Sequence, residues 1–335
     1  MAVLRTVSTV GVVGAGAWGT ALAAAAARAG REVLIWGRDA RTVDDINRHH
    51  ENRLRLPGIA LDDAIAATRS LDRVCAMDAI ILAVPAQSVR GTAADMAEAL
   101  PEGRPVVVAA KGFERGSGAF MSDVVAEVLP QAVVGILSGP SFAEDVAHGL
   151  PTAVTLACAD DDLCSALVEA IGHNTFRPYR SGDLIGVQVG GAVKNVLAIA
   201  CGVVVGKALG ASAQAALVAR SFAELTRLGR ALGARPETLA GLSGLGDLVL
   251  TATSAQSRNY SFGVALGRGE SVDELLGPRR PVTEGVWTAA AVVGRARALG
   301  IEMPICEAVA AVVAGRLPVD AAIEGLLSRP FRSEE

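Results

Sequence analysis

The sequence predicts an α/β fold in which a doubly wound parallel sheet is followed by an all-helical C-terminal domain. Three observations support this prediction. The chain opens with an apolar strand pattern that ends at a glycine-rich turn and continues into an alanine-rich segment. Apolar runs of strand length then alternate with helix-like stretches as far as Gly182. Beyond Gly182 the pattern shows no convincing strand, and segments with helical periodicity follow one another.

The first β-α-β unit is the clearest local pattern. Residues 6–13 alternate and then run apolar, as a buried strand does, and they stop at the glycine-rich turn. An alanine-rich helix pattern over residues 20–29 follows, and residues 32–36 have the pattern of a second strand. This order and length are typical of a unit that opens a parallel sheet.

The later elements continue the same alternation. Further strands are expected over residues 79–84, 105–109 and 133–137, with edge strands over 153–158 and 175–179. The C-terminal helices are expected over residues 184–207, 214–232, 283–299, 304–314 and 318–327. Asp183 is suited to cap the first of these helices, so we expect two domains, residues 1–182 and 183–335.

Composition narrows the classes of function. A chain of 335 residues exceeds what one hydrophobic core usually organises, and 51% hydrophobic with 20% charged residues is typical of a folded globular protein. A formal net charge of -4 gives no global attraction for nucleic acid or for an anionic membrane surface. We therefore expect small-molecule ligands and no nucleic-acid partner.

Three features of the sequence predict where in the cell the protein is found: the cysteines, the N-terminus and the most apolar stretch. Five scattered cysteines without metal-ligand spacing are expected to be reduced and mostly buried, and no metal site is expected. The N-terminal residues lead directly into the first strand, which favours a cytoplasmic protein over an exported one. Residues 193–206 are interrupted by Lys194 and Asn195 and are too short to span a bilayer, so a buried helix without membrane insertion is expected. The oligomeric state stays open, with a homodimer as one option.

The glycine-rich turn predicts a dinucleotide site, with residues 1–182 as the dinucleotide-binding domain. Gly14 permits the tight turn, Gly16 lets the backbone approach a pyrophosphate, and Gly19 allows the helix to pack closely on the strand. The helix N-terminus would face the phosphates, and Trp18 would line the cofactor cleft. The alternative is a purely structural β-turn-α unit.

The end of the second predicted strand distinguishes NADP from NAD. An NAD site carries an acidic residue there to bind the ribose hydroxyls. This chain has Gly37 at that position, followed by Arg38, whose planar cation suits a 2′-phosphate. NADPH is therefore the favoured cofactor, with NADH as the alternative. In a competing interpretation Arg38 is a solvated loop residue and Asp39 caps the next helix.

Lysine is rare in this chain, which draws attention to where it occurs. Only Lys111, Lys194 and Lys207 are lysines among 31 basic residues. A desolvated lysine can exchange a proton near neutral pH, whereas arginine cannot. Gly190 and Gly191 lie one helical turn before Lys194 and are expected to leave room for its ammonium. Lys207, which has no motif around it, is expected to be a solvated side chain.

Two downstream segments supply further polar groups. Asp247 follows a glycine-rich stretch at the start of a helix, where its alternative role is that of an ordinary N-cap. Residues 256–259 bring together the hydroxyl of Ser257, the guanidinium of Arg258 and the amide of Asn259. This set suits a phosphate, although the segment alone is equally consistent with a polar loop.

Taken together, these motifs closely resemble the bacterial-type NAD(P)-dependent glycerol-3-phosphate dehydrogenase family, whose first domain has a Rossmann-like sheet. The similar segments are residues 14–22, 110–112, 137–143, 185–195, 244–251, 256–259 and 282–285. The resemblance implies reversible reduction of dihydroxyacetone phosphate to sn-glycerol 3-phosphate, a backbone for membrane phospholipids.

The resemblance also implies roles for individual residues. Lys194 would donate and accept the proton, with Asp247 as its acidic partner and Lys111 beside them. The substrate would be held by Lys111, Gly139, Ser141, Lys194, Asp247, Ser257, Arg258 and Asn259. The cofactor would contact Gly14, Gly16, Ala17, Trp18, Gly19, Arg38, Lys111, Ala143, Arg258, Val282 and Glu284. The remaining hypotheses are a ketoacid or β-hydroxyacid reductase without a phosphate site, and a nucleotide-sensing protein without catalysis.

Overall fold

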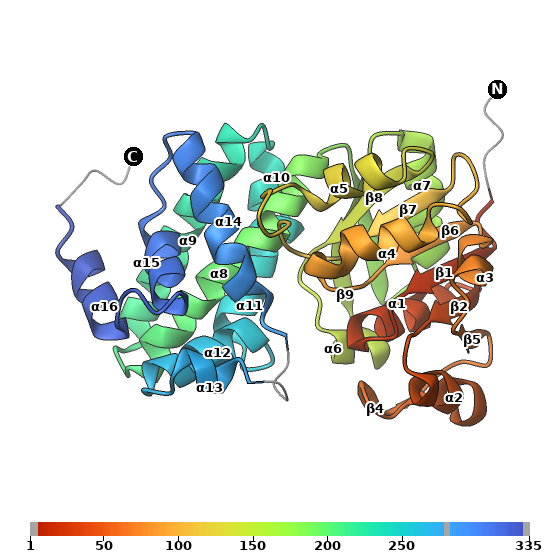
Figure 1. Ribbon diagram of the computed structural model, residues 1–335, viewed down its shortest axis with the longest axis horizontal. Coiled ribbons are helices and arrows are strands. Elements are labelled where there is room, and N and C mark those ends of the chain that lie inside the picture. Colours follow the sequence, from red (N-terminus) through yellow and green to blue (C-terminus); the bar gives the residue numbers. More distant parts are fainter. Residues whose placement is uncertain (1–5, 278–281, 331–335) are drawn as a thin grey trace.

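The computed structural model describes residues 6–277 and 282–330. Its first half is organised by an eight-stranded sheet in the order β10-β9-β8-β7-β6-β1-β2-β5 (Figure 1). The strands are β1 (Thr9–Val13), β2 (Glu32–Trp36), β5 (Ile65–Thr68), β6 (Ala79–Leu82), β7 (Pro105–Val108), β8 (Val133–Ser138), β9 (Thr152–Cys158) and β10 (Phe176–Ser181). The predicted doubly wound sheet is therefore confirmed, with β7 and β6 at its centre.

The sheet departs from the prediction in three respects. Strands β8 and β9 pair antiparallel, whereas all other neighbouring pairs in the sheet are parallel. Strand β9 lies inside the sheet, so only β10 of the two predicted edge strands forms an edge. The opposite edge is β5, which was not predicted because its sequence, Ile-Ala-Ala-Thr, is short and half alanine.

Helices cover both faces of this sheet (Figure 1). They are α1 (Ala17–Arg28), α2 (Ala40–His49), α3 (Leu71–Cys75), α4 (Val89–Met96), α5 (Met121–Val128), α6 (Ala143–Ala147) and α7 (Asp161–Ile171), with a short 3₁₀ turn η1 (Ala86–Ser88) and a small hairpin of β3 (Glu51–Asn52) and β4 (Leu56–Ala60). The alanine-rich α1 is almost entirely buried and packs against α6. It begins three residues before the predicted start, because Ala17, Trp18 and Gly19 belong to its first turn.

The second half of the described chain is helical around the long helix α8 (Leu184–Gly206) (Figure 1). The other helices are α9 (Ala211–Ala231), α10 (Pro236–Ala240), the π-helical turn η2 (Leu242–Gly246), α11 (Asp247–Thr253), α12 (Arg258–Gly267), α13 (Val272–Leu275), α14 (Glu284–Ala298), α15 (Pro304–Val313) and α16 (Val319–Leu327). The five predicted helices are confirmed within a few residues. Of the short elements between α9 and α14, only a helix start at Asp247 was predicted, and it is confirmed by α11.

Helix α8 begins at the predicted cap and crosses α12 at very close range. The Asp183 carboxylate accepts a hydrogen bond from the backbone N–H of Gly186 at 2.8 Å, which confirms the N-cap. Gly202 and Gly206 of α8 face Gly263 and Gly267 of α12, and a Cβ atom at any of the four would collide with the facing backbone. The two helix backbones are therefore in direct contact.

The length of α8 corrects one prediction. By length and composition alone the helix is long and apolar enough to cross a membrane, so the expectation that its apolar stretch was too short is wrong. However, 78% of its most apolar window is buried inside the structure, which is the behaviour of a core helix. The predicted buried helix is therefore confirmed.

Candidate active site

The glycine-rich turn joins β1 to α1 in a geometry that only glycine tolerates at two of its positions. Gly14 has φ +123°, and a Cβ atom on it would lie 2.8 Å from the carbonyl oxygen of Ala83. A Cβ atom on Gly19 would collide with the carbonyl of Gly14. At Gly16, by contrast, a Cβ atom would meet no atom of the structure within 4 Å. The first-turn amides of α1 therefore lie beside open space, the arrangement that binds a phosphate at a helix N-terminus.

After β2, Asp39 caps the next helix, and Arg38 remains available for a phosphate. The Asp39 carboxylate accepts a hydrogen bond from the backbone N–H of Arg41 at 3.0 Å and caps α2, as the alternative prediction had it. Arg38 is exposed at the carboxyl end of β2 and is not consumed by that cap. Since the cap uses Asp39, the guanidinium of Arg38 stays accessible to an anionic group.

Three segments far apart in sequence bring two lysines onto one carboxylate. The Nζ of Lys194, from the middle of α8, donates to Oδ1 of Asp247 at 2.5 Å. The Nζ of Lys111, which follows β7, donates to Oδ2 of the same residue at 2.8 Å. Asp247 is 0% exposed, so this lysine cluster (Lys111, Lys194 and Asp247) is a buried ionic group that bridges the sheet and the helices.

The lysine cluster gives Lys194 an unusual protonation equilibrium. The pKa of Lys194 is lowered to about 7: burial is the largest cause, Asp247 opposes it, and the charge of Lys111 adds to the lowering. Thr251, one helical turn after Asp247, accepts a hydrogen bond from the same ammonium at 2.7 Å. A lysine with these neighbours can both give and take a proton near neutral pH.

The structure corrects the predicted surroundings of this cluster. Gly190 does not leave room for the ammonium: a Cβ atom there would collide with Ser243, so this glycine lets η2 dock on α8. A Cβ atom on Gly191 would instead collide with the Ser138 hydroxyl and touch the stem of Lys111, so this glycine makes room for those two side chains. Asp247 is not an N-cap either, because η2 runs directly into α11 and its carboxylate is bound by the lysines.

A second hydrogen-bonded group extends the site along α12. The Asn259 side-chain nitrogen donates to Oδ1 of Asn195 at 2.9 Å, and its oxygen accepts from the backbone N–H of Gly285 at 2.9 Å. Ser257 caps α12 by accepting from the backbone N–H of Tyr260. Arg258, the first residue of α12, is exposed and lies close enough to Glu284 to act on its charge.

The other predicted contacts follow β8 or precede α14. The carbonyl of Gly139, at φ +141°, accepts hydrogen bonds from Lys111 at 2.9 Å and from the Ser141 hydroxyl at 3.0 Å. Ala143 begins α6 just beyond it. Val282 is exposed at the entry to α14.

Glu284 links the two halves of the molecule at the start of α14. Its Oε1 accepts a hydrogen bond from the backbone N–H of Ala86 at 3.2 Å, whereas its buried Oε2 has no partner among the described residues. Burial raises the pKa of Glu284, against the opposing effects of the Ala86 N–H and the charge of Arg258. One carboxylate oxygen therefore remains for a ligand.

The segment after Lys111 anchors that lysine to the helical part of the molecule. Phe113 and Phe120 are buried in the core of the helical part, and the guanidinium of Arg295 lies 5.3 Å and 4.2 Å from their ring centroids. The Gln87 side chain donates to the carbonyl of Phe113 at 2.9 Å. The segment that follows Lys111 is therefore packed against Arg295 of α14.

Some features of the site were missed or wrongly predicted. Thr251 and Asn195 were not singled out, although Thr251 follows Asp247 by four residues, the spacing that places two side chains on one helix face. Lys207 is not simply solvated, because its Nζ pairs with Asp320 at 2.5 Å.

All five cysteines are buried free thiols, as predicted. Within residues 6–277 and 282–330 no group of three or more potential metal ligands is found.

Comparisons with known proteins agree along the whole chain. Family models described as the N-terminus and C-terminus of NAD-dependent glycerol-3-phosphate dehydrogenase match residues 9–164 and 183–324. A protein of Parvibaculum lavamentivorans described as glycerol-3-phosphate dehydrogenase [NAD(P)+] is 58% identical over 325 residues, covering 97% of this chain and 98% of that protein. A protein of Maricaulis maris with the same description is 56% identical, covering 97% and 98%.

A solved structure agrees as well. The crystal structure of glycerol-3-phosphate dehydrogenase from Coxiella burnetii superposes with a TM-score of 0.91 at 36% identity, covering 96% of this chain and 99% of that one.

Proposed function

The chain belongs to the NAD-dependent glycerol-3-phosphate dehydrogenase family, and on that premise we propose that Lys194 is its proton donor and acceptor. It is an NAD(P)-dependent oxidoreductase acting on glycerol 3-phosphate. The observation that carries the proposal is the buried contact of Lys194 with Asp247 and Thr251. In the reductive direction, the Lys194 ammonium polarises the carbonyl oxygen of dihydroxyacetone phosphate and then protonates it.

The neighbours of Lys194 prepare it for this step. Asp247 keeps the ammonium charged and Thr251 fixes its direction, while the Lys111 charge keeps its proton mobile. In the oxidative direction, neutral Lys194 takes the proton from the secondary hydroxyl. Proton transfer by a positioned group contributes about 10²–10⁴-fold, so orientation of the substrate supplies much of the remaining rate effect.

The proposed substrate contacts surround this cluster. The Lys111 ammonium donates hydrogen bonds to the Asp247 carboxylate and to the Gly139 carbonyl. It is therefore placed to bind the substrate beside Lys194. Arg258 is the exposed cation at the N-terminus of α12, where the helix dipole also favours an anion, and we assign it to the substrate phosphate. The full proposed set is Lys111, Gly139, Ser141, Lys194, Asp247, Ser257, Arg258 and Asn259.

The residues present fit a dinucleotide. The space above Gly16 and the free first-turn amides of α1 suit a pyrophosphate, and Glu284 retains one unpartnered oxygen beside the cleft. Bound nicotinamide would supply the hydride that reduces the keto carbon. The proposed set is Gly14, Gly16, Ala17, Trp18, Gly19, Arg38, Lys111, Ala143, Arg258, Val282 and Glu284. Because Gly37 takes the place of the acid that would select NAD, and Arg38 beside it can pair with a 2′-phosphate, we propose that NADPH is preferred over NADH.

The wider role is proposed from the same reaction. We assign residues 1–182 to cofactor binding and 183–335 to the substrate. We place the enzyme in the cytoplasm, without membrane insertion, where sn-glycerol 3-phosphate would serve as a backbone for phospholipids. A homodimer is retained as its proposed assembly.

The experiment is to mix the protein with NADPH and dihydroxyacetone phosphate and to follow the loss of reduced-nicotinamide absorbance. Rapid oxidation is expected with the phosphorylated substrate and very slow oxidation with dihydroxyacetone, because the smaller molecule offers nothing to Arg258. Equal rates with both substrates would contradict a phosphate site.

A further inference from the structure

A large cavity in the helical part of the described chain is remote from the lysine cluster. It has a volume of about 860 Å³ and lies between α8, α9, α15 and α16. On α8 it begins at Ile199, beyond the turns that carry Lys194, and no residue of the lysine cluster lines it. The reaction proposed above therefore makes no use of this cavity.

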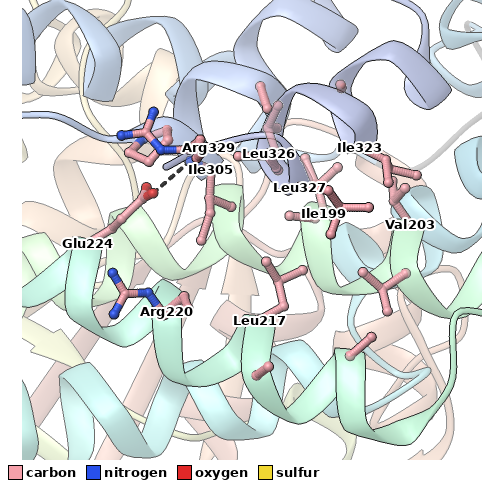
Figure 2. Close-up of a pocket in the computed structure, with 18 of the residues that line it drawn as sticks. Ile199, Val203, Leu217, Arg220, Glu224, Ile305, Ile323, Leu326, Leu327 and Arg329 are labelled. Carbon is pink, nitrogen blue, oxygen red and sulfur yellow. Dashed lines mark hydrogen bonds between the residues drawn. The ribbon is translucent and has the colours of Figure 1, made fainter. Parts of the chain in front are cut away.

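Apolar side chains form most of its walls. Figure 2 shows Ile199 and Val203 of α8 facing Ile323 and Leu327 of α16 across the cavity, with Leu217 of α9 below them. Leu327 is 81% exposed at the rim. Water in contact with such walls has few polar partners, so the cavity favours an apolar occupant.

Charged side chains gather at one end of the cavity. Arg220, Glu224 and Arg329 lie there together (Figure 2), with Arg227 and Glu302 also in the lining. The Glu224 carboxylate accepts from the backbone N–H groups of Ile305 and Cys306 and caps α15. Burial raises the pKa of Glu224 to about 7, and these two N–H groups oppose that rise.

The remaining charges leave one cation available. Arg329 pairs with Glu302 at 3.0 Å, and Arg227 donates to the backbone carbonyl of Glu302 at 3.1 Å. Arg220 is exposed and makes no hydrogen bond or ion pair with another residue in the described ranges. The charged end of the cavity therefore offers a guanidinium to an anion.

We propose that this pocket binds the alkyl chain of a single-chain anionic amphiphile, for which a fatty acid is the simplest probe, with the head group at Arg220. An apolar cavity of several hundred Å³ with few polar groups, all at one end, matches such a molecule in both shape and charge. A nucleotide does not fit, because the walls offer neither aromatic faces nor hydrogen-bond donors along their length.

A second copy of the chain is a weaker match to the cavity. To fill it, the partner would have to present a convex apolar segment. Apart from Val205, Leu209 and Leu327 at or near the cavity itself, the exposed large apolar side chains lie singly on separate elements. They are Leu54, Leu150, Tyr179, Val249, Val282 and Leu299. Among the residues that the structure describes, these positions form no continuous apolar ridge.

Calorimetric titration of the full chain with decanoate, dodecanoate and tetradecanoate, each below its micelle concentration, tests the proposal. We expect one site per chain and about tenfold tighter binding for every two added methylenes. Dodecyltrimethylammonium should bind at least tenfold more weakly than dodecanoate. Saturating NADPH and glycerol 3-phosphate should not displace dodecanoate; their displacing it would move the site to the lysine cluster and overturn the proposal.

Two variants and a control locate the site. Arg220→Ala should weaken dodecanoate binding about tenfold or more, and Leu327→Asp should weaken it because a carboxylate then stands on the apolar rim. Arg230→Ala, an exposed arginine on the same helix outside the cavity, should leave binding unchanged. No binding to any fatty acid would overturn the proposal. The proposal would also be overturned if the protein bound none of the amphiphiles and formed a dimer that Leu327→Asp dissociates, because the cavity would then be a contact between two copies of the chain.

Discussion

The glycine turn between β1 and α1 and the lysine cluster around Asp247 are built in opposite ways. The turn is contiguous: Gly14, Gly16 and Gly19 act within six residues, and their geometry is decided by backbone sterics. The lysine cluster joins Lys111 and Asp247, 136 residues apart, and it exists only because β7, α8 and α11 meet. A substitution in the turn can therefore weaken ligand binding there without disturbing the arrangement of the lysine cluster, whereas the lysine cluster depends on how the elements pack together.

The sharpest test of this contrast is Lys194→Arg, which should remove chemistry but leave the turn intact. We expect turnover to fall about 10²–10⁴-fold, because a guanidinium does not release its proton near neutral pH. Cofactor binding, followed by NADPH fluorescence, should be unchanged. Lys207→Arg is the matched control, since that lysine pairs with Asp320 away from the site, and it should retain full activity. Near-normal turnover of Lys194→Arg would remove this lysine from the mechanism.

The pH dependence of the two directions should be opposite if Lys194 transfers the proton. Its pKa in the free enzyme is lowered to about 7. Reduction needs the ammonium, so kcat/KM for dihydroxyacetone phosphate should be constant below about pH 7 and fall about tenfold per unit above it. Oxidation needs the neutral amine, so kcat/KM for glycerol 3-phosphate should rise towards pH 7 and then level off.

Asp247→Asn sharpens the pH experiment. Asp247 raises the pKa of Lys194, so its removal should move both profiles to lower pH, in addition to lowering the rate. Profiles of the same sign in the two directions, or profiles that the variant does not shift, would assign the titration to another group.

Substitutions at Gly16 and Gly14 should have different effects, because only Gly16 has free space for a side chain. Gly16→Val should leave the melting temperature unchanged, since the space beside Gly16 is free of protein atoms and its backbone is extended. It should weaken NADPH binding about 10–100-fold, because the side chain would stand where the phosphates meet the α1 amides.

Gly14→Ala is the structural counterpart of that variant. It should lower the melting temperature, because it combines a positive φ with a collision at the Ala83 carbonyl. Equal losses of thermal stability in the two variants would show that Gly16 has a structural role as well.

The sequence predicts the local features of this molecule better than the features that depend on tertiary packing. The β1-turn-α1 unit, the capping of α8 by Asp183 and the central strands depend on neighbouring residues, and all are confirmed. The antiparallel β9 and the edge strand β5 depend on what lies beside them in the sheet, which no local period encodes. The meeting of the two lysines was implied only by resemblance to a family. Gly190 was misread because its contact, η2, comes from a segment fifty residues later.

The smallest expected effect is on cofactor choice and concerns the loop after β2. The sequence allowed two interpretations of this loop, with Arg38 either binding a phosphate or remaining solvated. Arg38→Ala should raise the Michaelis constant for NADPH about tenfold and leave that for NADH nearly unchanged, because only NADPH carries the 2′-phosphate. Arg41→Ala is the control: this exposed arginine is two positions after the α2 cap, and its loss should affect neither cofactor. Because Asp39 already supplies the cap, Arg38→Ala should also leave thermal stability unaltered. An equal rise for both cofactors would mean that Arg38 does not distinguish NADPH from NADH, and the selectivity would then have to come from residues outside this loop.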